Sequence, residues 1–307
     1  MSEDPTSKAT GKPTGELPGD PGEDPIARAL GYPYPRHPGP VLFDPGSGAH
    51  AAHVVDIGPE RGHVVAGLRV PVPSRAVAIT TEHQTIEIED AVVLIAAGSN
   101  GSTVQLARKY RGRRSARPIL IAPATVSGAV SVYSAHIASY GSVPATMYPA
   151  GHPTGHPVGH RAGDRTGDAR AALHVLMMPA EELAHINATE SLGVNYVLAA
   201  PHGVSAIVEG VTIARPLAYV SKRGAAAPDA SPVLLAQTGG AATGYPALSQ
   251  PEMLERVRAY VGHAAALRDF VARLSGDRAA RMAVTERLAA TALRWDLADD
   301  EIVADGL

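Results

Sequence analysis

The chain has 307 residues, a length typical of one large domain or two small ones. Its 27 basic and 30 acidic side chains give a formal net charge of −3, which excludes bulk electrostatic capture of nucleic acid or of an anionic membrane as the main activity. The absence of cysteine excludes disulfides, thiolate nucleophiles and zinc sites with cysteine ligands. Hydrophobic residues make up 45% of the chain and aromatic residues only 4%, so the core is expected to consist mainly of Ala, Val, Leu and Ile.

The N-terminal 40 residues differ from the rest in composition. They hold nine of the 26 prolines and have little apolar content before Ile26. Such a segment buries too little surface to offset its ordering entropy, so residues 1–40 are predicted to form a disordered tail. The start lacks the apolar run of a secretory signal, and no apolar window of about 18 residues predicts a membrane span. We therefore expect a cytoplasmic protein.

Residues 41–90 are predicted to be a β-rich lead-in to the main domain. Short runs of β-forming residues alternate there with Gly and Pro, at a spacing that favours hairpins over helices. The expected strands are Val41–Phe43, His53–Ile57, Val64–Val70, Ala76–Ile79 and Thr85–Ile88.

Residues 91–250 show the clearest secondary structure. The run Ala91–Ala97 is continuously apolar, as expected of a strand buried on both faces, and it leads through a Gly98–Gly101 turn into a predicted helix Ser102–Tyr110 with Ser102 as its N-cap. A second short helix is predicted over Pro179–Thr189. Many strands with only two short helices indicate a mixed α+β domain. The other expected strands are Ile119–Ala122, Ala129–Ser134, Ala145–Tyr148, Leu173–Met178, Tyr196–Ala200, Ala206–Val211, Pro216–Val220 and Val233–Ala236.

Residues 151–170 are rich in Gly, Pro and His and predict a loop insertion. Pro or Gly flanks each of His152, His156 and His160, so no helix can align these side chains as metal ligands. A metal site is therefore not expected. Residues 251–307 predict a helical hairpin, with one helix over 252–274 and a second capped by Asp277. These helices are expected to pack on the main domain or on a second copy of the chain.

The Gly98–Gly101 turn is a candidate anion site. A strand that enters a glycine-containing turn and then a helix presents several unpaired backbone N–H groups, which suit a carboxylate or a developing oxyanion. A tight turn that simply requires glycine is the alternative. The basic run from Arg108 to Arg117 is interpreted as a solvated helix end instead of a site.

Glu190 is a candidate catalytic residue. It follows Leu183, Ile186 and Asn187 at helical spacing, on the face of the second helix that is predicted to be buried. A carboxyl group on such a face is costly unless it has partners or a chemical task, and proton transfer is one such task. A frayed helix end with Glu190 in solvent is the alternative.

Four motifs, in this order, resemble the γ-glutamylcyclotransferase-like family, which includes the AIG2-like proteins. The family's buried strand ending in Tyr-Gly-Ser-Asn is similar to Val92–Asn100 here. Its later patterns are a Gly-x-x-Ala-Thr strand followed by Pro-Gly, a helix of the type Leu-x-x-Leu-Asp-x-x-Glu-Gly, and two strands with Tyr. These are resembled by Gly141–Gly151, Leu183–Ser191, Asn195–Leu198 and Leu217–Val220, and the resemblance covers roughly residues 91–222.

The resemblance implies a small mixed β-barrel flanked by short helices, with a pocket at its mouth and no metal or other cofactor. It implies that Glu190 is the general acid/base. Its implied substrate-binding residues are Gly98, Ser99, Asn100 and Gly101, which would hold a substrate carboxylate, and also Thr146, Tyr196 and Tyr219. Two positions depart from the family pattern: Ala97 stands where the family has Tyr, and Ser191 stands where Gly follows the glutamate.

The leading hypothesis is therefore a lyase or acyltransferase that cleaves a γ-glutamyl-type amide by intramolecular cyclisation. The alternatives are an amide hydrolase in which Glu190 activates water, a non-catalytic small-molecule-binding domain, and a weak anion or nucleic-acid binder through Arg108–Arg117. The expected partner is a small molecule with a carboxylate, and neither nucleic acid nor membrane is expected as the main partner. A second copy bound through the C-terminal helices is a candidate homodimer.

Overall fold

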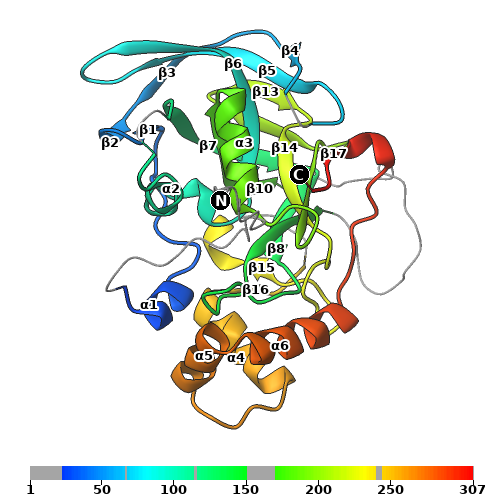
Figure 1. Ribbon diagram of the computed structural model, residues 1–307. Helices are drawn as coiled ribbons and strands as arrows, with labels where there is room; N and C mark the ends of the chain where they lie inside the picture. The colour runs from blue at the N-terminus through cyan, green and yellow to red at the C-terminus, as the bar shows by residue number, and fades with distance from the viewer. Residues whose placement is uncertain (1–22, 66–67, 114–115, 151–169, 240–243, 307) are drawn as a thin grey trace, which may run out of the picture.

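The computed structural model describes residues 23–65, 68–113, 116–150, 170–239 and 244–306 (Figure 1). Within these residues the chain forms two β-sheets, with helices packed on them and gathered at one end. The predicted α+β class is confirmed. No described helix is long and apolar enough to cross a membrane.

The larger sheet has thirteen strands and is almost entirely antiparallel; only β14 and β6 pair in parallel on its main path. That path runs in the order β13 (Val211–Ala214), β12 (Ser205–Val208), β7 (Ile119–Ser127), β10 (Arg170–Met178), β6 (Thr85–Ala96), β14 (Leu217–Ser221), β11 (Tyr196–Ala199) and β17 (Ile302–Ala304). The strands off the path are β1 (Val41–Asp44), β2 (Gly48–Ala51), β3 (His53–Ile57), β4 (Arg61–His63) and β5 (Val72–Thr80).

The expected β-barrel is not found: among the described strands no pairing closes the sheet between β13 and β17. One reason is visible at residue 128, where the chain leaves the large sheet after β7 and enters a second sheet. That sheet has four strands in the order β16 (Ala247–Leu248), β15 (Leu234–Leu235), β8 (Ala129–Tyr133) and β9 (Ala145–Pro149). These four strands pair with one another and not with β13 or β17, the ends of the large sheet.

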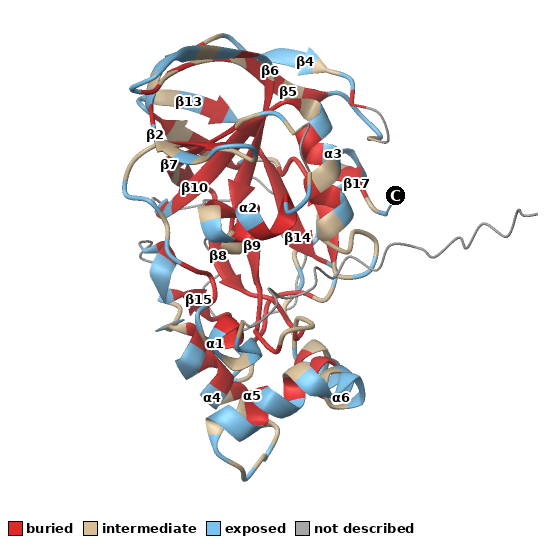
Figure 2. Cartoon of the chain, turned by 60° about the vertical axis from the view of Figure 1, so that its left-hand side comes forward, coloured by how far each residue is buried: buried red, intermediate tan, exposed pale blue. Residues whose placement is uncertain are grey.

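Strand β6 lies in the middle of the large sheet, and its apolar run is buried on both faces as predicted. Val93 and Ile95 belong to one hydrophobic cluster, whereas Val92, Leu94 and Ala96 belong to the other, as the two-residue period of a strand requires. The second cluster is covered by α2 (Thr103–Lys109) and α3 (Ala180–Thr189). The first is covered by the smaller sheet and by the helices at the end of the molecule. The outward faces of these helices are exposed (Figure 2).

Ordered structure begins earlier than the composition predicts. Within the segment expected to be disordered, residues 23–40 are described, and α1 (Pro25–Leu30) starts behind an Asp24 side chain that accepts a hydrogen bond from the Ile26 N–H. Ala29 and Tyr32 are buried in the main core. Residues 1–22 lie outside the described part of the chain.

The C-terminal helices also differ from the prediction. The single helix expected over 252–274 is two helices, α4 (Gln250–Tyr260) and α5 (Leu267–Gly276). Between them Gly262 takes a left-handed φ of +68°, and the Arg258 side chain donates to the carbonyls of His263 and Ala265 in the turn. Asp277 caps α6 (Arg278–Ala290) as predicted. The strand expected over Val64–Val70 is not found in its described part: β4 ends at His63, and residues 64–65 and 68–70 form no strand, while residues 66–67 lie outside the described residues.

The turn between the two sheets yields a test. Gly128 has φ +86°, and a Cβ there would collide with the Gly203 carbonyl oxygen. Gly128→Ala is therefore expected to lower the free energy of unfolding by about 3 kcal/mol or more, since left-handed strain and overpacking add. Gly112→Ala is the matched control, because Gly112 has φ +78° but open space around it, and about 1 kcal/mol is expected there. Urea unfolding measures both, and equal losses would contradict the proposed collision.

Candidate functional site

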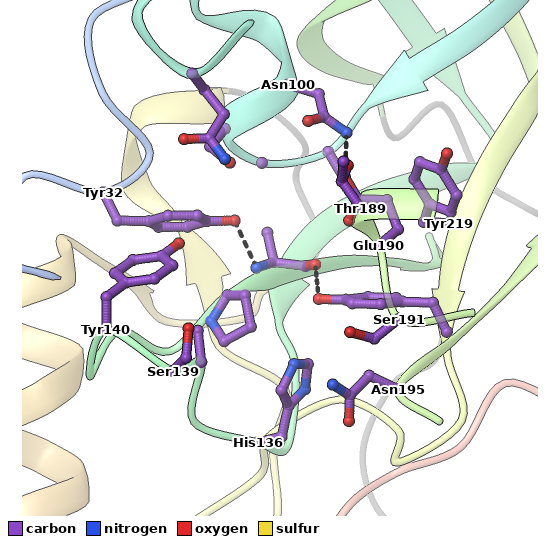
Figure 3. Close-up of a pocket in the computed structure, with 18 of the residues that line it drawn as sticks. Tyr32, Asn100, His136, Ser139, Tyr140, Thr189, Glu190, Ser191, Asn195 and Tyr219 are labelled. Carbon is purple, nitrogen blue, oxygen red and sulfur yellow. Dashed lines mark hydrogen bonds between the residues drawn. The ribbon is translucent and has the colours of Figure 1, made fainter. Parts of the chain in front are cut away.

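A polar pocket of about 150 Å³ lies where β6 ends, between the turn after β6, the end of α3 and the segment after β8 (Figure 3). This volume suits a ligand group about the size of one small ring. Six of the eight predicted site residues line it. They are Gly98, Ser99, Asn100, Glu190, Tyr196 and Tyr219.

The turn after β6 is held by the N-terminal segment. It forms a short 3₁₀ helix η1 (Ser99–Gly101), and Arg36 donates to the Gly98 carbonyl at 2.9 Å. Gly98 itself is required sterically, because a Cβ there would collide with the Tyr32 hydroxyl. Within the turn the Gly101 N–H donates to the Gly98 carbonyl at 3.5 Å. The N–H groups of Ser99 and Asn100 come first in the helix and have no acceptor within it.

Glu190 directly follows α3, and its carboxylate is paired. Its Oε1 accepts from Asn100 Nδ2 at 2.9 Å and forms an ion pair with Lys109 Nζ, whereas Oε2 has no hydrogen bond to a described residue (Figure 3). The side chain of Glu190 is 17% exposed and that of Lys109 only 3%. Ser191, which stands where the family has Gly, has φ +52°, so the turn keeps a left-handed conformation.

The interpretation of the basic run as a solvated face is wrong for its first two residues. Arg108 and Lys109 are both buried. Arg108 forms an ion pair with Glu23 and lies over the Tyr34 ring, 4.4 Å from its centroid. Helical position alone did not reveal this, because the acidic partners come from the N-terminal segment and from the end of α3.

Buried tyrosines supply neutral hydroxyl groups to the pocket. Burial raises the pKa of Tyr32, Tyr196 and Tyr219 above the usual value, and the charge of Glu190 raises each further. The Tyr196 hydroxyl donates to the Ala145 carbonyl at 3.1 Å, and the Ala145 N–H donates to the Tyr32 hydroxyl at 2.7 Å (Figure 3). Tyr219 donates to Asn187 Oδ1 at 2.6 Å.

Two predicted residues do not line the pocket. Thr146 is buried in β9, where its Oγ1 accepts from the Ser221 N–H at 2.8 Å. Gly101 packs on the other side of the turn, against Ala96, His174 and Arg36.

The histidines expected in the loop insertion, His152, His156 and His160, lie outside the described residues. His174, which follows them, contacts the His37 carbonyl through Nε2 at 2.8 Å. Among the described residues no group of three or more His, Cys, Asp or Glu side chains is arranged to hold a metal ion.

Among the pocket residues that sequence reasoning missed are Tyr32, Lys109, His136 and Asn195. The proline-rich composition concealed Tyr32, and the basic run concealed Lys109. His136 and Asn195 lie just outside predicted strands, and only the polar character of a residue beside a buried strand could have pointed to them.

Comparisons with protein-family models, curated proteins and solved structures find nothing that matches this chain significantly. The chemistry of the pocket must therefore be argued from its own residues. They combine one paired carboxylate, neutral hydroxyl groups and a backbone turn, a set suited to proton transfer and to binding an anion.

The ion pair predicts a coupling that can be measured. Lys109→Met and Glu190→Gln are each expected to lower the free energy of unfolding by about 2 to 4 kcal/mol, because each leaves the other group largely buried without its charged partner. The double variant buries no unpaired charge, so its loss should be smaller than the sum by about 1 kcal/mol or more. Urea unfolding of the four chains measures this cycle, and additive losses would show that the two groups are not coupled.

Proposed function

We propose that this pocket binds a γ-glutamyl-type amide and cleaves it by intramolecular cyclisation, with Glu190 as general acid/base and no cofactor. The observation that carries the proposal is the state of the Glu190 carboxylate. Asn100 and Lys109 both bind Oε1, whereas Oε2 has no hydrogen-bond partner among the described residues, and Glu190 lines the pocket. A fixed carboxylate with one oxygen available is suited to accept and return a proton.

The proposed reaction balances without water or an external reagent. Glu190 Oε2 takes a proton from the substrate's α-ammonium group, and the resulting amine attacks the γ-amide carbonyl carbon. A C–N bond forms and closes a five-membered ring, and the carbonyl oxygen takes up the displaced electron pair. When the original amide C–N bond breaks, the electron pair on the oxygen re-forms the carbonyl, and the carboxyl group gives its proton to the leaving nitrogen. The ring nitrogen then loses its second hydrogen as a proton, which Glu190 passes to the released amine. The products are 5-oxoproline and the free amine.

The other pocket residues fit defined roles in this reaction. The backbone N–H groups of Gly98, Ser99 and Asn100, the part of the turn that lines the pocket, would hold the substrate's α-carboxylate, in the manner of an anion at a helix start. The hydroxyls of Tyr196 and Tyr219 are uncharged, and because each donates its proton to a protein oxygen, each would serve the substrate as an acceptor, which suits its α-ammonium group. Tyr32 supplies an aromatic ring to a pocket that Ala97 also lines, at the position where the family has Tyr.

The resemblance to the γ-glutamylcyclotransferase-like family supports the same proposal. The α+β class and the meeting of the Gly98–Gly101 turn with Glu190 in one pocket agree with it. The large open sheet, the helical end and the loop insertion are additions to that pattern, so we propose a divergent member that acts on its own amide substrate.

Mass spectrometry of a panel of γ-glutamyl amines and γ-glutamyl amino acids tests the proposal. Wild type is expected to release 5-oxoproline, and Glu190→Gln is expected to lose turnover by at least about a hundredfold, because its side chain cannot accept the proton. The Lys109→Met, Glu190→Gln double variant serves as a folded control without an unpaired buried charge, and it should also be inactive.

Each other outcome has a definite meaning. Release of glutamate in place of 5-oxoproline would identify an amide hydrolase. Turnover retained in Glu190→Gln would exclude Glu190 as the acid/base. Binding of these compounds without turnover of any of them would contradict the enzymatic proposal and favour a small-molecule-binding domain.

A further inference from the structure

His136 presents a hydrogen-bond acceptor to the pocket, at a position fixed by its neighbours. It follows β8, and its Nδ1 lies 2.8 Å from Ser134 Oγ, which in turn donates to Ser221 Oγ at 2.7 Å. Because the single hydroxyl proton of Ser134 is used in that bond, Ser134 can only accept from His136. The proton therefore resides on Nδ1, and Nε2 carries a lone pair.

The Nε2 atom is free to act on a ligand. His136 lines the pocket, and Nε2 makes no hydrogen bond to any described residue. Burial, together with the positive charge of Arg223, lowers the pKa of His136 to about 3. The imidazole is therefore neutral under physiological conditions and acts as an acceptor instead of a cation.

Asn195 presents the complementary donor to the same pocket. Its Oδ1 accepts from Arg223 Nε at 3.0 Å, which orients the amide so that Nδ2 is left for another partner. Nδ2 has no hydrogen bond within the described residues, and Asn195 also lines the pocket. Figure 3 shows both side chains at the end of the view away from Asn100.

One uncharged acceptor and one uncharged donor select for a particular group. A carboxylate would bring a negative oxygen against the Nε2 lone pair, and an ammonium would bring its protons against those of Nδ2. A carboxamide satisfies both, because its N–H donates to His136 and its carbonyl accepts from Asn195. The one cation of the pocket lining outside the Glu190 pair, Arg28, already has Glu23 at 3.9 Å and lies over the Tyr140 ring.

We propose that His136 and Asn195 recognise an amide in the leaving part of the substrate, so that the preferred substrate is a γ-glutamyl compound whose leaving amine continues into a carboxamide or peptide bond. This inference rests on the proposed function in placing the amide on the part of the substrate that is released. The recognition of an amide by these two residues is independent of turnover.

The test compares γ-glutamyl-alaninamide with γ-glutamyl-alanine, which differ only in the terminal group. Wild type is expected to prefer the amide in kcat/KM by about tenfold or more, the effect of one or two well-formed hydrogen bonds. His136→Phe keeps a ring but removes the acceptor, so the preference should fall towards unity. His136→Gln offers an amide oxygen as acceptor and should retain part of the preference. His263→Phe, at the helical end and away from the pocket lining, is the matched control and should leave it unchanged.

Calorimetric binding of the same two compounds to Glu190→Gln separates this inference from the proposed function. An amide preference in binding, without turnover by wild type, would leave the recognition standing and overturn the cyclisation. Turnover of both compounds with equal efficiency in wild type, or a preference unaffected in His136→Phe, would overturn the recognition and leave the cyclisation standing.

Discussion

The pairing of the Lys109 ammonium with the Glu190 carboxylate is the interaction on which the candidate site depends. It joins two residues that are 81 positions apart in the chain, at the end of α2 and directly after α3. Both helices cover the same face of the large sheet, and the pair fixes how their ends meet beside the turn that follows β6. Two largely buried charges are tolerated there because each compensates the other and Asn100 adds a hydrogen bond.

The N-terminal segment completes this arrangement from the opposite side. Tyr32 reaches the backbone of Ala145, and Arg36 binds the carbonyl of Gly98, so residues that precede the first strand hold both the turn and the wall of the pocket. Glu23 pairs with Arg108 one residue before Lys109. A segment rich in proline has little secondary structure of its own to form, and it is ordered here by these contacts with the folded domain.

The polar groups of the pocket divide into a charged end and a neutral end. Glu190, Lys109 and Asn100 form the charged end, where the second carboxylate oxygen of Glu190 has no partner among the described residues. His136 and Asn195 form the neutral end, where a lone pair and an amide donor face a ligand. This division suits a substrate that combines ionised groups at the reacting part with an uncharged amide further along.

The sequence by itself determined the local features: the buried strand of β6, the turn at Gly98, the inward face of α3 that leads to Glu190, and the Asp277 cap. These depend on side-chain periodicity and on capping chemistry, which act over a few residues. Only the tertiary structure decided that Lys109 is buried beside Glu190, that Tyr32 and His136 reach the pocket, and that the sheet stays open. Strand pairing and charge pairing join residues that are far apart in the chain, and many such pairings are compatible with one local pattern.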